Sequence, residues 1–353
     1  QKVFVGGAGV VARHVARTGA NTYLLSAAAN DDATARARRI FSDDGITHRL
    51  IPCRAELPEK TRYMVDTRKL FRVDNGQAYP LDSLAEQEAL EWIQSKAAEV
   101  DVVIFCDAGF GTVTSGLLDG LRMFLEAPER VVAADVSGPH SDLLAFKQAD
   151  LLCPSERELR AAMHNFEDGL SSVAFHAMQR TNALSMIVTL GKNGLVAFDR
   201  QSLNPLSLGW DARLRSEYLP SLAGEVVDSL GCGSALLTLA ALTRAVGGTS
   251  MQSAYLGSAL AAVEIAQAGN IPIDLDDLKR VLKAAHGRSG DTAVPGARRA
   301  CPPGTGGGAA SLPQSAVDVV SHLADGQAYG FTTGPSFSLA GNAALQTAKA
   351  SWY

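Results

Sequence analysis

The sequence lacks the patterns that mark several common classes of protein. No apolar run reaches the roughly 18 residues that span a bilayer, and no signal-peptide pattern is visible, so we expect a cytoplasmic protein without a membrane partner. The five cysteines and seven histidines show no CxxC or HxxxH spacing, which argues against zinc and favours buried free thiols. The 32 basic and 37 acidic side chains leave no basic excess, which argues against a nucleic-acid partner.

Aromatic residues are also scarce, at 6%, whereas the chain has 33 glycines and many alanines. This composition favours close packing of helices on a sheet over an aromatic-rich β-sandwich. A length of 353 residues with 46% hydrophobic residues predicts one large domain or two unequal ones.

Apolar runs that end in a polar residue alternate with helical patterns along much of the chain. The run 101–107 ends in Asp107, the run 130–135 ends in Asp135, and Ser155 follows the run 151–154. Such runs suit parallel strands that are buried on both faces, and ligands bind at the carboxyl ends of these strands. The other expected strands are 23–26, 49–53, 185–190 and 195–199, and the expected helices are 33–43, 84–98, 115–125, 143–149, 156–165, 173–181, 235–246, 253–268 and 274–285. We therefore predict an α/β, doubly wound, mainly parallel sheet.

A small β lid is expected near residues 47–75. The runs 61–66 and 69–74 alternate in polarity and predict a hairpin. Its two arginines, Arg62 and Arg72, are candidates for binding a phosphate through charge-assisted hydrogen bonds. They are equally well explained as solvated charges on an exposed hairpin.

Three glycine-containing motifs carry the local signals for chemistry. Asp228-Ser-Leu-Gly-Cys-Gly-Ser234 opens a helix, where backbone N–H groups and the helix dipole can hold an anion, although a tight structural loop explains it equally well. Gly6-Gly7-Ala8-Gly9 also precedes a helix, but its spacing does not match a dinucleotide fingerprint. Thr189-Leu-Gly-Lys-Asn-Gly194 is more simply explained as a hairpin turn.

The order of these motifs resembles that of the ribokinase-like, PfkB-type carbohydrate kinases. Lys60-Thr61-Arg62 through Asp74, and Cys106-Asp107-Ala108-Gly109, look most like the kinase half of the bifunctional enzyme that makes ADP-heptose. The resemblance covers about residues 5–285 and implies a ribokinase-like fold, with ATP and Mg²⁺ as cofactors. It also implies a phosphorylated sugar as substrate and a homodimer formed through the lid.

The resemblance assigns roles to individual residues of this chain. Gly231, Cys232 and Gly233 would form an anion hole, with Ser234 at the position of the family's catalytic acid. The sugar phosphate would be bound by Gly6, Gly7, Arg62, Arg72, Asp107 and Asp228. The nucleotide would be bound by Ser155, Glu158, Thr189, Gly191 and Gly194, and Glu158 would help to place the metal indirectly.

The departures from the family pattern bear on function. Ser234 cannot accept the proton of the attacking hydroxyl, and such help from a base is typically worth about 10²–10⁴-fold. Ser155 replaces an asparagine, and Asp135-Val136-Ser137-Gly138 lacks the family's lysine. The family's first strand, which carries a sugar-binding acid, has no counterpart before the glycine motif. These losses predict a protein that binds a sugar phosphate, and ATP with it, but transfers phosphate poorly or not at all.

Two other functions stay open at this point. The protein could be an active kinase for a heptose phosphate that uses another base, for which Asp107 is the candidate. It could also be an enzyme repurposed for a related sugar in a secondary-metabolite pathway, with Ser234 or Cys232 as nucleophile, because a helix N-terminus favours a thiolate.

The last part of the chain differs in composition from the rest. We expect residues 1–288 to form the kinase domain and residues 289–315, rich in proline and glycine, to form a linker. Residues 316–353 resemble the opening of the family's nucleotidyltransferase half at 330–334, but 339–342 lack its histidines. We interpret them as a truncated remnant, a partial C-terminal α/β segment with helices near 316–324 and 343–350.

Overall fold

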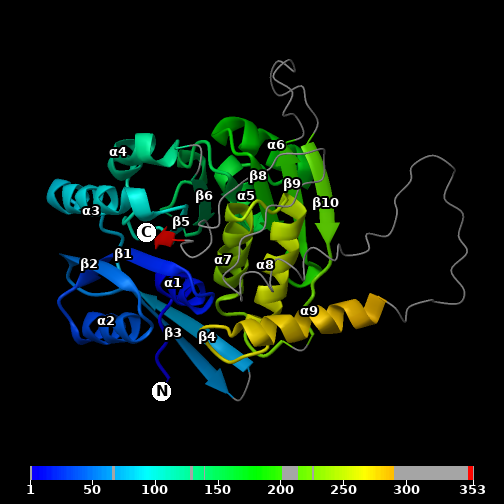
Figure 1. Ribbon diagram of the computed structural model, residues 1–353, viewed down its shortest axis with the longest axis horizontal. Coiled ribbons are helices and arrows are strands. Elements are labelled where there is room, and N and C mark those ends of the chain that lie inside the picture. Colours follow the sequence, from blue (N-terminus) through cyan, green and yellow to red (C-terminus); the bar gives the residue numbers. More distant parts are fainter. Residues whose placement is uncertain are drawn as a thin grey trace, which may run out of the picture.

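The computed structural model describes residues 2–65, 68–127, 130–138, 140–200, 214–224, 226–289 and 349–352. In these residues a nine-stranded sheet runs in the order β10-β9-β8-β7-β6-β5-β11-β1-β2, and β3 and β4 form a separate hairpin (Figure 1). The strands are β1 (Asn21–Ala29), β2 (Thr47–Arg54), β3 (Glu59–Val65), β4 (Arg68–Asn75), β5 (Val102–Asp107), β6 (Val131–Val136), β7 (Leu151–Leu152), β8 (Ser185–Thr189), β9 (Leu195–Arg200), β10 (Leu214–Leu219) and β11 (Lys349–Trp352).

The sheet is mainly parallel, as predicted. Neighbours from β2 across to β8 pair in parallel, whereas β9 pairs antiparallel with β8 and β10 antiparallel with β9. The position of strand β5 between two hydrophobic cores explains why its sequence is almost wholly apolar. Val102 and Ile104 join the core on one face of the sheet, while Val103 and Phe105 join the core on the other.

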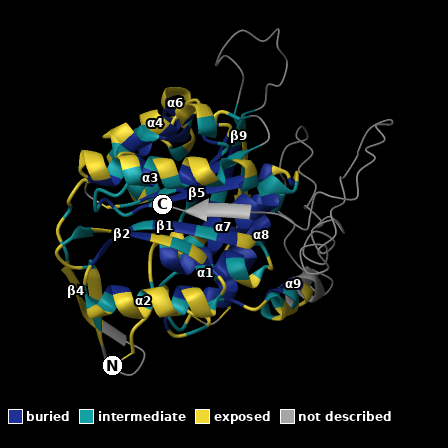
Figure 2. Cartoon of the chain, turned by 60° about the vertical axis from the view of Figure 1, so that its left-hand side comes forward, coloured by how far each residue is buried: buried dark blue, intermediate teal, exposed yellow. Residues whose placement is uncertain are grey.

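Helices cover both faces of the sheet, which makes the fold doubly wound (Figure 2). One face carries α1 (Ala8–Arg17), α2 (Asp32–Asp43), α7 (Cys232–Ala245), α8 (Ser250–Ile265) and α9 (Leu275–Ser289). The other carries α3 (Ser83–Lys96), α4 (Ser115–Leu125), α5 (Glu156–Met163) and α6 (Leu170–Thr181). Side-chain oxygens of Asp31, Asp82 and Thr114 accept backbone N–H groups in the first turns of α2, α3 and α4, which fixes where these helices begin. Among the described helices, none combines the length and apolar character that crossing a bilayer requires.

Three elements differ from the sequence-based expectation. The helix expected at 143–149 is only the 3₁₀ turn Leu143–Ala145. Strand β10 was not expected, because an edge strand that is largely exposed has a polar sequence. The helix expected at 343–350 is wrong for residues 349 and 350, which belong to β11 between β1 and β5. The expected helix 316–324, the residues 330–334 and 339–342, and nearly all of the expected linker lie outside the described residues.

Candidate functional site

The loop before α7 forms an open helix N-terminus. Gly231 is the N-cap residue with φ 82°, and no described side chain caps the helix. Gly233 is exposed and Ser234 is half-buried, so the first turn is accessible. Because the first N–H groups of a helix have no partner within it, this turn can hold an anion. The open first turn lies where the sequence predicted an anion hole, and the binding roles of Gly231, Cys232, Gly233 and Ser234 stay predictions.

Asp228 stabilises the shape of this loop. Its Oδ1 accepts the N–H of Leu230 at 3.0 Å, and its Oδ2 accepts the N–H of Gly269 at 3.3 Å. Its own N–H donates to the carbonyl of Ile265 at 3.1 Å. Asp228 thus ties the loop to the segment that follows α8, and this structural role stands beside its predicted role in binding the sugar.

Two acids at the carboxyl edge of the sheet lie close to the same loop. Asp107 ends β5, is 7% exposed, and accepts the N–H of Gly109 at 2.9 Å. Asp135, near the end of β6, points toward α7, because a Cβ built on Gly233 would lie 4.0 Å from its Oδ2. Burial, with the negative charges of Glu158 and Asp107, raises the pKa of Asp135 to about 7. Burial also raises the pKa of Asp107.

The predicted nucleotide residues Ser155, Glu158 and Thr189 also meet at this edge. Ser155, which lies beyond the end of β7, forms a parallel β-bridge with Thr189, the last residue of β8. Ser155 caps α5, and Glu158 Oε2 accepts both the N–H and the Oγ–H of Ser155, at 2.8 and 2.7 Å. This capping box engages one carboxyl oxygen of Glu158. Within the described residues, no three histidine, cysteine or acidic side chains are grouped so as to enclose a metal.

Gly191 and Gly194 lie in the turn that joins β8 to β9. Gly194 has φ 92°, and a Cβ there would lie only 2.7 Å from the backbone nitrogen of Ser221. Packing of the edge strand therefore requires a glycine at this position. The hairpin interpretation of this motif is confirmed, and its role with a nucleotide stays a prediction.

The N-terminal glycine motif lies against the α7 loop through one side chain, that of Asn270. The Nδ2 of Asn270 donates to the carbonyl of Val5 at 3.0 Å and lies 3.5 Å from a Cβ built on Gly6. On its other side, Asn270 Oδ1 lies 2.6 Å from a Cβ built on Gly231. Gly6 and Gly7 are exposed, and Gly7 is the N-cap residue of α1. The fold thus places two accessible helix N-termini on either side of Asn270.

Sequence reasoning missed a buried acid beside this loop. Glu264, in the last turn of α8, is 0% exposed, and its Oε1 lies 2.6 Å from a Cβ built on Gly231. Burial and the negative charge of Asp228 raise its pKa to about 7, which the nearby N–H of Ile271 offsets only in part. The available signal was that Glu264 is the one charged residue in the apolar, small-residue sequence of α8.

Burial opposes the thiolate expected at Cys232, and the role of this residue as a nucleophile stays a prediction. Burial raises the pKa of this thiol, with smaller contributions from Glu264 and Asp135, so the neutral thiol is favoured at the helix start. Cys53, Cys106, Cys153 and Cys232 are free, as expected.

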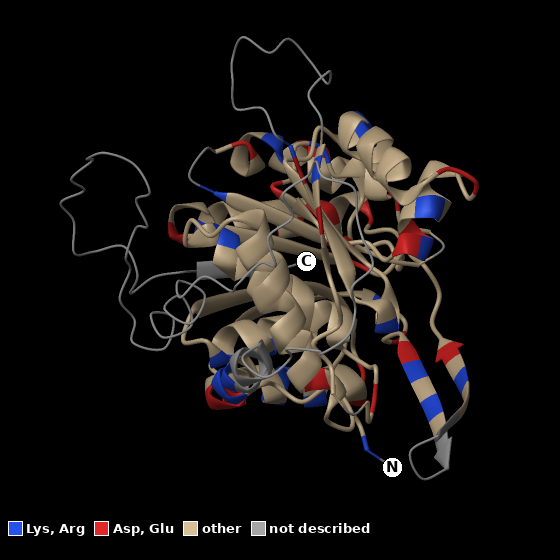
Figure 3. Ribbon diagram, turned by 90° about the vertical axis from the view of Figure 1, so that its right-hand side faces the viewer, with Lys and Arg blue, Asp and Glu red and all other residues tan. Residues whose placement is uncertain are grey.

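The lid arginines face each other across the hairpin. Arg62 of β3 pairs in register with Arg72 of β4, and Figure 3 shows further charged residues on both strands. Arg72 also forms an ion pair with Asp74 at 2.7 Å, with both side chains partly exposed. Like charges placed directly opposite are unfavourable unless an anion lies between them. Lys60 lies 5.5 Å from the ring centroid of Phe110, which links the lid to the loop after β5.

Comparison with known proteins identifies the class. Residues 1–277 match the model of the pfkB family carbohydrate kinases, so the chain belongs to this family. Two solved structures share the fold of this chain, although their sequences are at most 16% identical to it. The structure of phosphofructokinase-2 from Escherichia coli in complex with potassium superposes with a TM-score of 0.64 at 14% identity, covering 78% of this chain and 85% of that one. Ribokinase from Thermotoga maritima gives 0.60 at 16% identity, with coverage of 80% and 89%.

Curated relatives show which members of the family are similar to this chain in sequence. The bifunctional protein HldE of Pelobacter propionicus is 25% identical over 82% of this chain and 57% of its own length. The HldE protein of Caulobacter vibrioides is 28% identical over 83% of this chain and 59% of its own. The chain is therefore a sugar kinase homologue related to the kinase domain of HldE, and it spans less than two thirds of the relatives it matches.

Proposed function

We propose that the protein binds a sugar phosphate of the heptose phosphate type, together with ATP, and transfers phosphate poorly or not at all. The sugar would lie between the glycine motif and the α7 loop, with its phosphate beneath the lid arginines. The observation that carries the proposal is Ser234, which stands at the open first turn of α7 where the family's catalytic acid is expected.

The geometry of the loop supports binding without efficient chemistry. The uncapped α7 N-terminus provides N–H groups for a phosphoryl group. Ser234 has a hydroxyl whose pKa is far too high to accept a proton near neutral pH. Retaining the anion hole while losing the base leaves affinity largely intact and lowers the rate.

ATP and Mg²⁺ fit this edge of the sheet only in part. Mg²⁺ would neutralise phosphate charge, and Asp135 and Glu158 are the acids placed to meet it, since their mutual repulsion favours a bound cation. One oxygen of Glu158 is already engaged by Ser155. We therefore propose a weaker metal and nucleotide site than one with an asparagine at position 155 would provide.

One observation favours a second candidate, an active heptose phosphate kinase with a different base. Asp135 faces Gly233 and has a pKa of about 7, the range in which a general base is most effective at neutral pH. This arrangement makes Asp135 a better substitute than Asp107, whose Oδ1 accepts the N–H of Gly109.

A coupled assay with ATP, Mg²⁺ and heptose 7-phosphate distinguishes the two functions. Binding is measured separately by the thermal shift that each ligand produces. Our proposal predicts stabilisation by the sugar phosphate with a transfer rate at least about 10²-fold below that of Ser234→Asp. Rapid transfer by the native protein that Asp135→Asn abolishes would establish the second candidate.

We also propose that the lid mediates a homodimer. Tyr63 and Phe71 stack with ring centroids 4.3 Å apart, yet they are 48% and 52% exposed, as are Leu70 at 62% and Val73 at 46%. A two-stranded ribbon with this much apolar surface is marginal by itself. A second copy of the lid would cover it.

A further inference from the structure

Three acceptor oxygens converge beside Gly231, and the backbone N–H of Ile271 compensates the Glu264 carboxyl group only in part. Both carboxyl oxygens of Glu264 and the Oδ1 of Asn270 are buried, and within the described part of the chain none of them has a hydrogen bond of good geometry. Glu264 Oε1 and Asn270 Oδ1 both lie 2.6 Å from the position of a Cβ on Gly231, so a glycine is needed there and the two oxygens are at most about 5 Å apart. Buried polar groups without partners are costly, so the cluster requires a proton donor.

The orientation of the Asn270 amide is set by its other contact. Its Nδ2 must face the carbonyl of Val5, because that carbonyl can only accept. The Oδ1 is therefore turned toward Glu264 and Gly231. A carboxylate at position 264 would repel this oxygen, whereas a carboxylic acid has an O–H that can donate to it.

We propose that Glu264 is a positioning residue that, in its protonated form, donates a hydrogen bond to Asn270 and thereby holds the glycine motif against the α7 loop. Asn270 then donates to Val5, immediately before Gly6 and Gly7, so the two bonds form a continuous bridge from α8 to the start of α1. The inference rests on the proposed function, because the segments that it joins are those proposed to bind the sugar phosphate.

The surrounding charges favour the protonated acid. Asp228, on the loop before α7, and Cys232, in the first turn of α7, are the ionisable groups that face Glu264, and the charge of Asp228 opposes ionisation. From α1, His14 contacts the same segment, since its Nδ1 accepts the N–H of Ile273 at 3.4 Å, and it is neutral because burial lowers its pKa to about 4. Within the described residues, α9, β9 and β10 add no charge that contributes to the pKa of Glu264. Raising the pH should therefore remove the donor and loosen the bridge.

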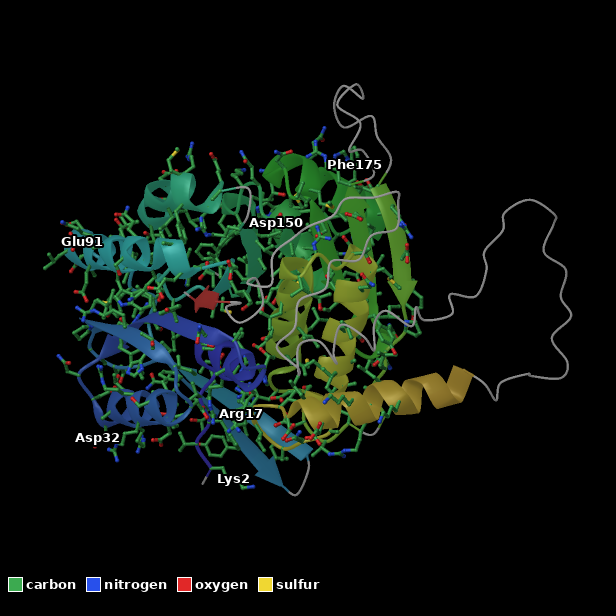
Figure 4. The ribbon with its side chains drawn as sticks, viewed as in Figure 1. Lys2, Arg17, Asp32, Glu91, Asp150 and Phe175 are labelled. Atoms are coloured by element: carbon green, nitrogen blue, oxygen red, sulfur yellow. The ribbon has the colours of Figure 1, made fainter. Side chains whose placement is uncertain are left out.

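Two substitutions separate a positioning role from the mere burial of a charge. Glu264→Gln keeps a donor for Asn270 at every pH, whereas Glu264→Met fills the same space without a donor. The matched control is Glu91→Gln, which removes a carboxylate from the outer surface of α3, where Figure 4 labels it. Affinity for heptose 7-phosphate is measured calorimetrically at pH 6 and pH 8, and each variant is compared with the native protein at the same pH.

We expect Glu264→Gln to match the native affinity at pH 6 and to exceed it at pH 8 by about fivefold, the worth of one hydrogen bond. Glu264→Met should bind more weakly than Glu264→Gln at both values, and Glu91→Gln should follow the native protein. Equal affinities for the Gln and Met variants would overturn the inference.

A second readout needs no ligand. Amide hydrogen exchange of the peptide that covers residues 3–10 reports on the start of α1, where Gly9 N–H donates to Gly6 at 3.1 Å. At pH 6 this exchange should be faster in Glu264→Met than in Glu264→Gln, and equal exchange would refute the bridge. If neither the native protein nor any variant binds heptose 7-phosphate, the proposed function fails. The hydrogen-exchange comparison of Glu264→Met with Glu264→Gln then decides the inference without a ligand.

Discussion

Replacing Glu264 with glutamine should stabilise the protein, and the gain should depend on pH. The pKa of Glu264 is about 7 in the folded chain against an ordinary 4.5. An acid whose pKa is raised by folding is fully compatible with the fold below pH 4.5. Its stability contribution is lost as the pH rises through 7, because the folded state must then bury a charge. Glutamine has no charge to bury.

The size of the effect follows from the interval between the two pKa values. At about 1.36 kcal/mol per pH unit, that interval corresponds to about 3 kcal/mol at pH 8 and to less than about 1 kcal/mol at pH 5. Asp135 also titrates near 7 and makes the native profile fall over the same range. The comparison of Glu264→Gln with the native protein cancels that contribution, since Asp135 is unchanged in both.

The assay is urea denaturation of the native protein, Glu264→Gln and Glu91→Gln at several values between pH 5 and pH 8. The free energies of unfolding of the native protein and Glu264→Gln should diverge as the pH rises, while Glu91→Gln should stay parallel to the native protein. A Glu264→Gln gain that is the same at pH 5 and pH 8 would refute the reasoning, because burial would then not oppose ionisation of this acid.

Three further predictions concern the loop and the lid. Gly231→Ala should lower the free energy of unfolding by at least about 2 kcal/mol, because φ is 82° and the new Cβ would meet Glu264 and Asn270. The control is Gly169→Ala, where φ is −59° and the space is open, and equal losses of stability for the two variants in a thermal melt would contradict the prediction. Phe71→Glu should convert the proposed dimer to a monomer in analytical ultracentrifugation, whereas Met123→Glu, which changes an exposed residue of α4, should not. A dimer that persists in Phe71→Glu would exclude the lid as the dimer interface. Arg62→Ala should weaken calorimetric binding of heptose 7-phosphate about tenfold, with Arg122→Ala as the exposed control, and unchanged affinity would show that Arg62 is only a solvated charge.

The buried parts of the fold could be predicted from the sequence because their patterns are set by the sheet itself. Strand β5 is apolar on both faces and ends in Asp107, so its place in a parallel sheet and the position of its acid follow from local sequence alone. The exposed edge strand β10 carries no such constraint, and its polar sequence resembles that of a loop.

The site could be predicted only where its residues lie within one motif. Asp228 through Ser234 are adjacent in sequence, and the glycines and helix start that make an anion site are visible there. Glu264 and Asn270 meet Gly231 only because α8 packs on α7 and returns its last turn to the loop. No local pattern reports that contact, although a single acid on an otherwise apolar helix is a signal worth testing.

The most direct test of the central claim is the rate of phosphate transfer from ATP to heptose 7-phosphate by the native protein and by Ser234→Asp, measured under identical conditions. If the pocket persists and only the proton acceptor is missing, Ser234→Asp should be faster by about 10²-fold or more. A native rate that equals or exceeds that of Ser234→Asp would contradict the account.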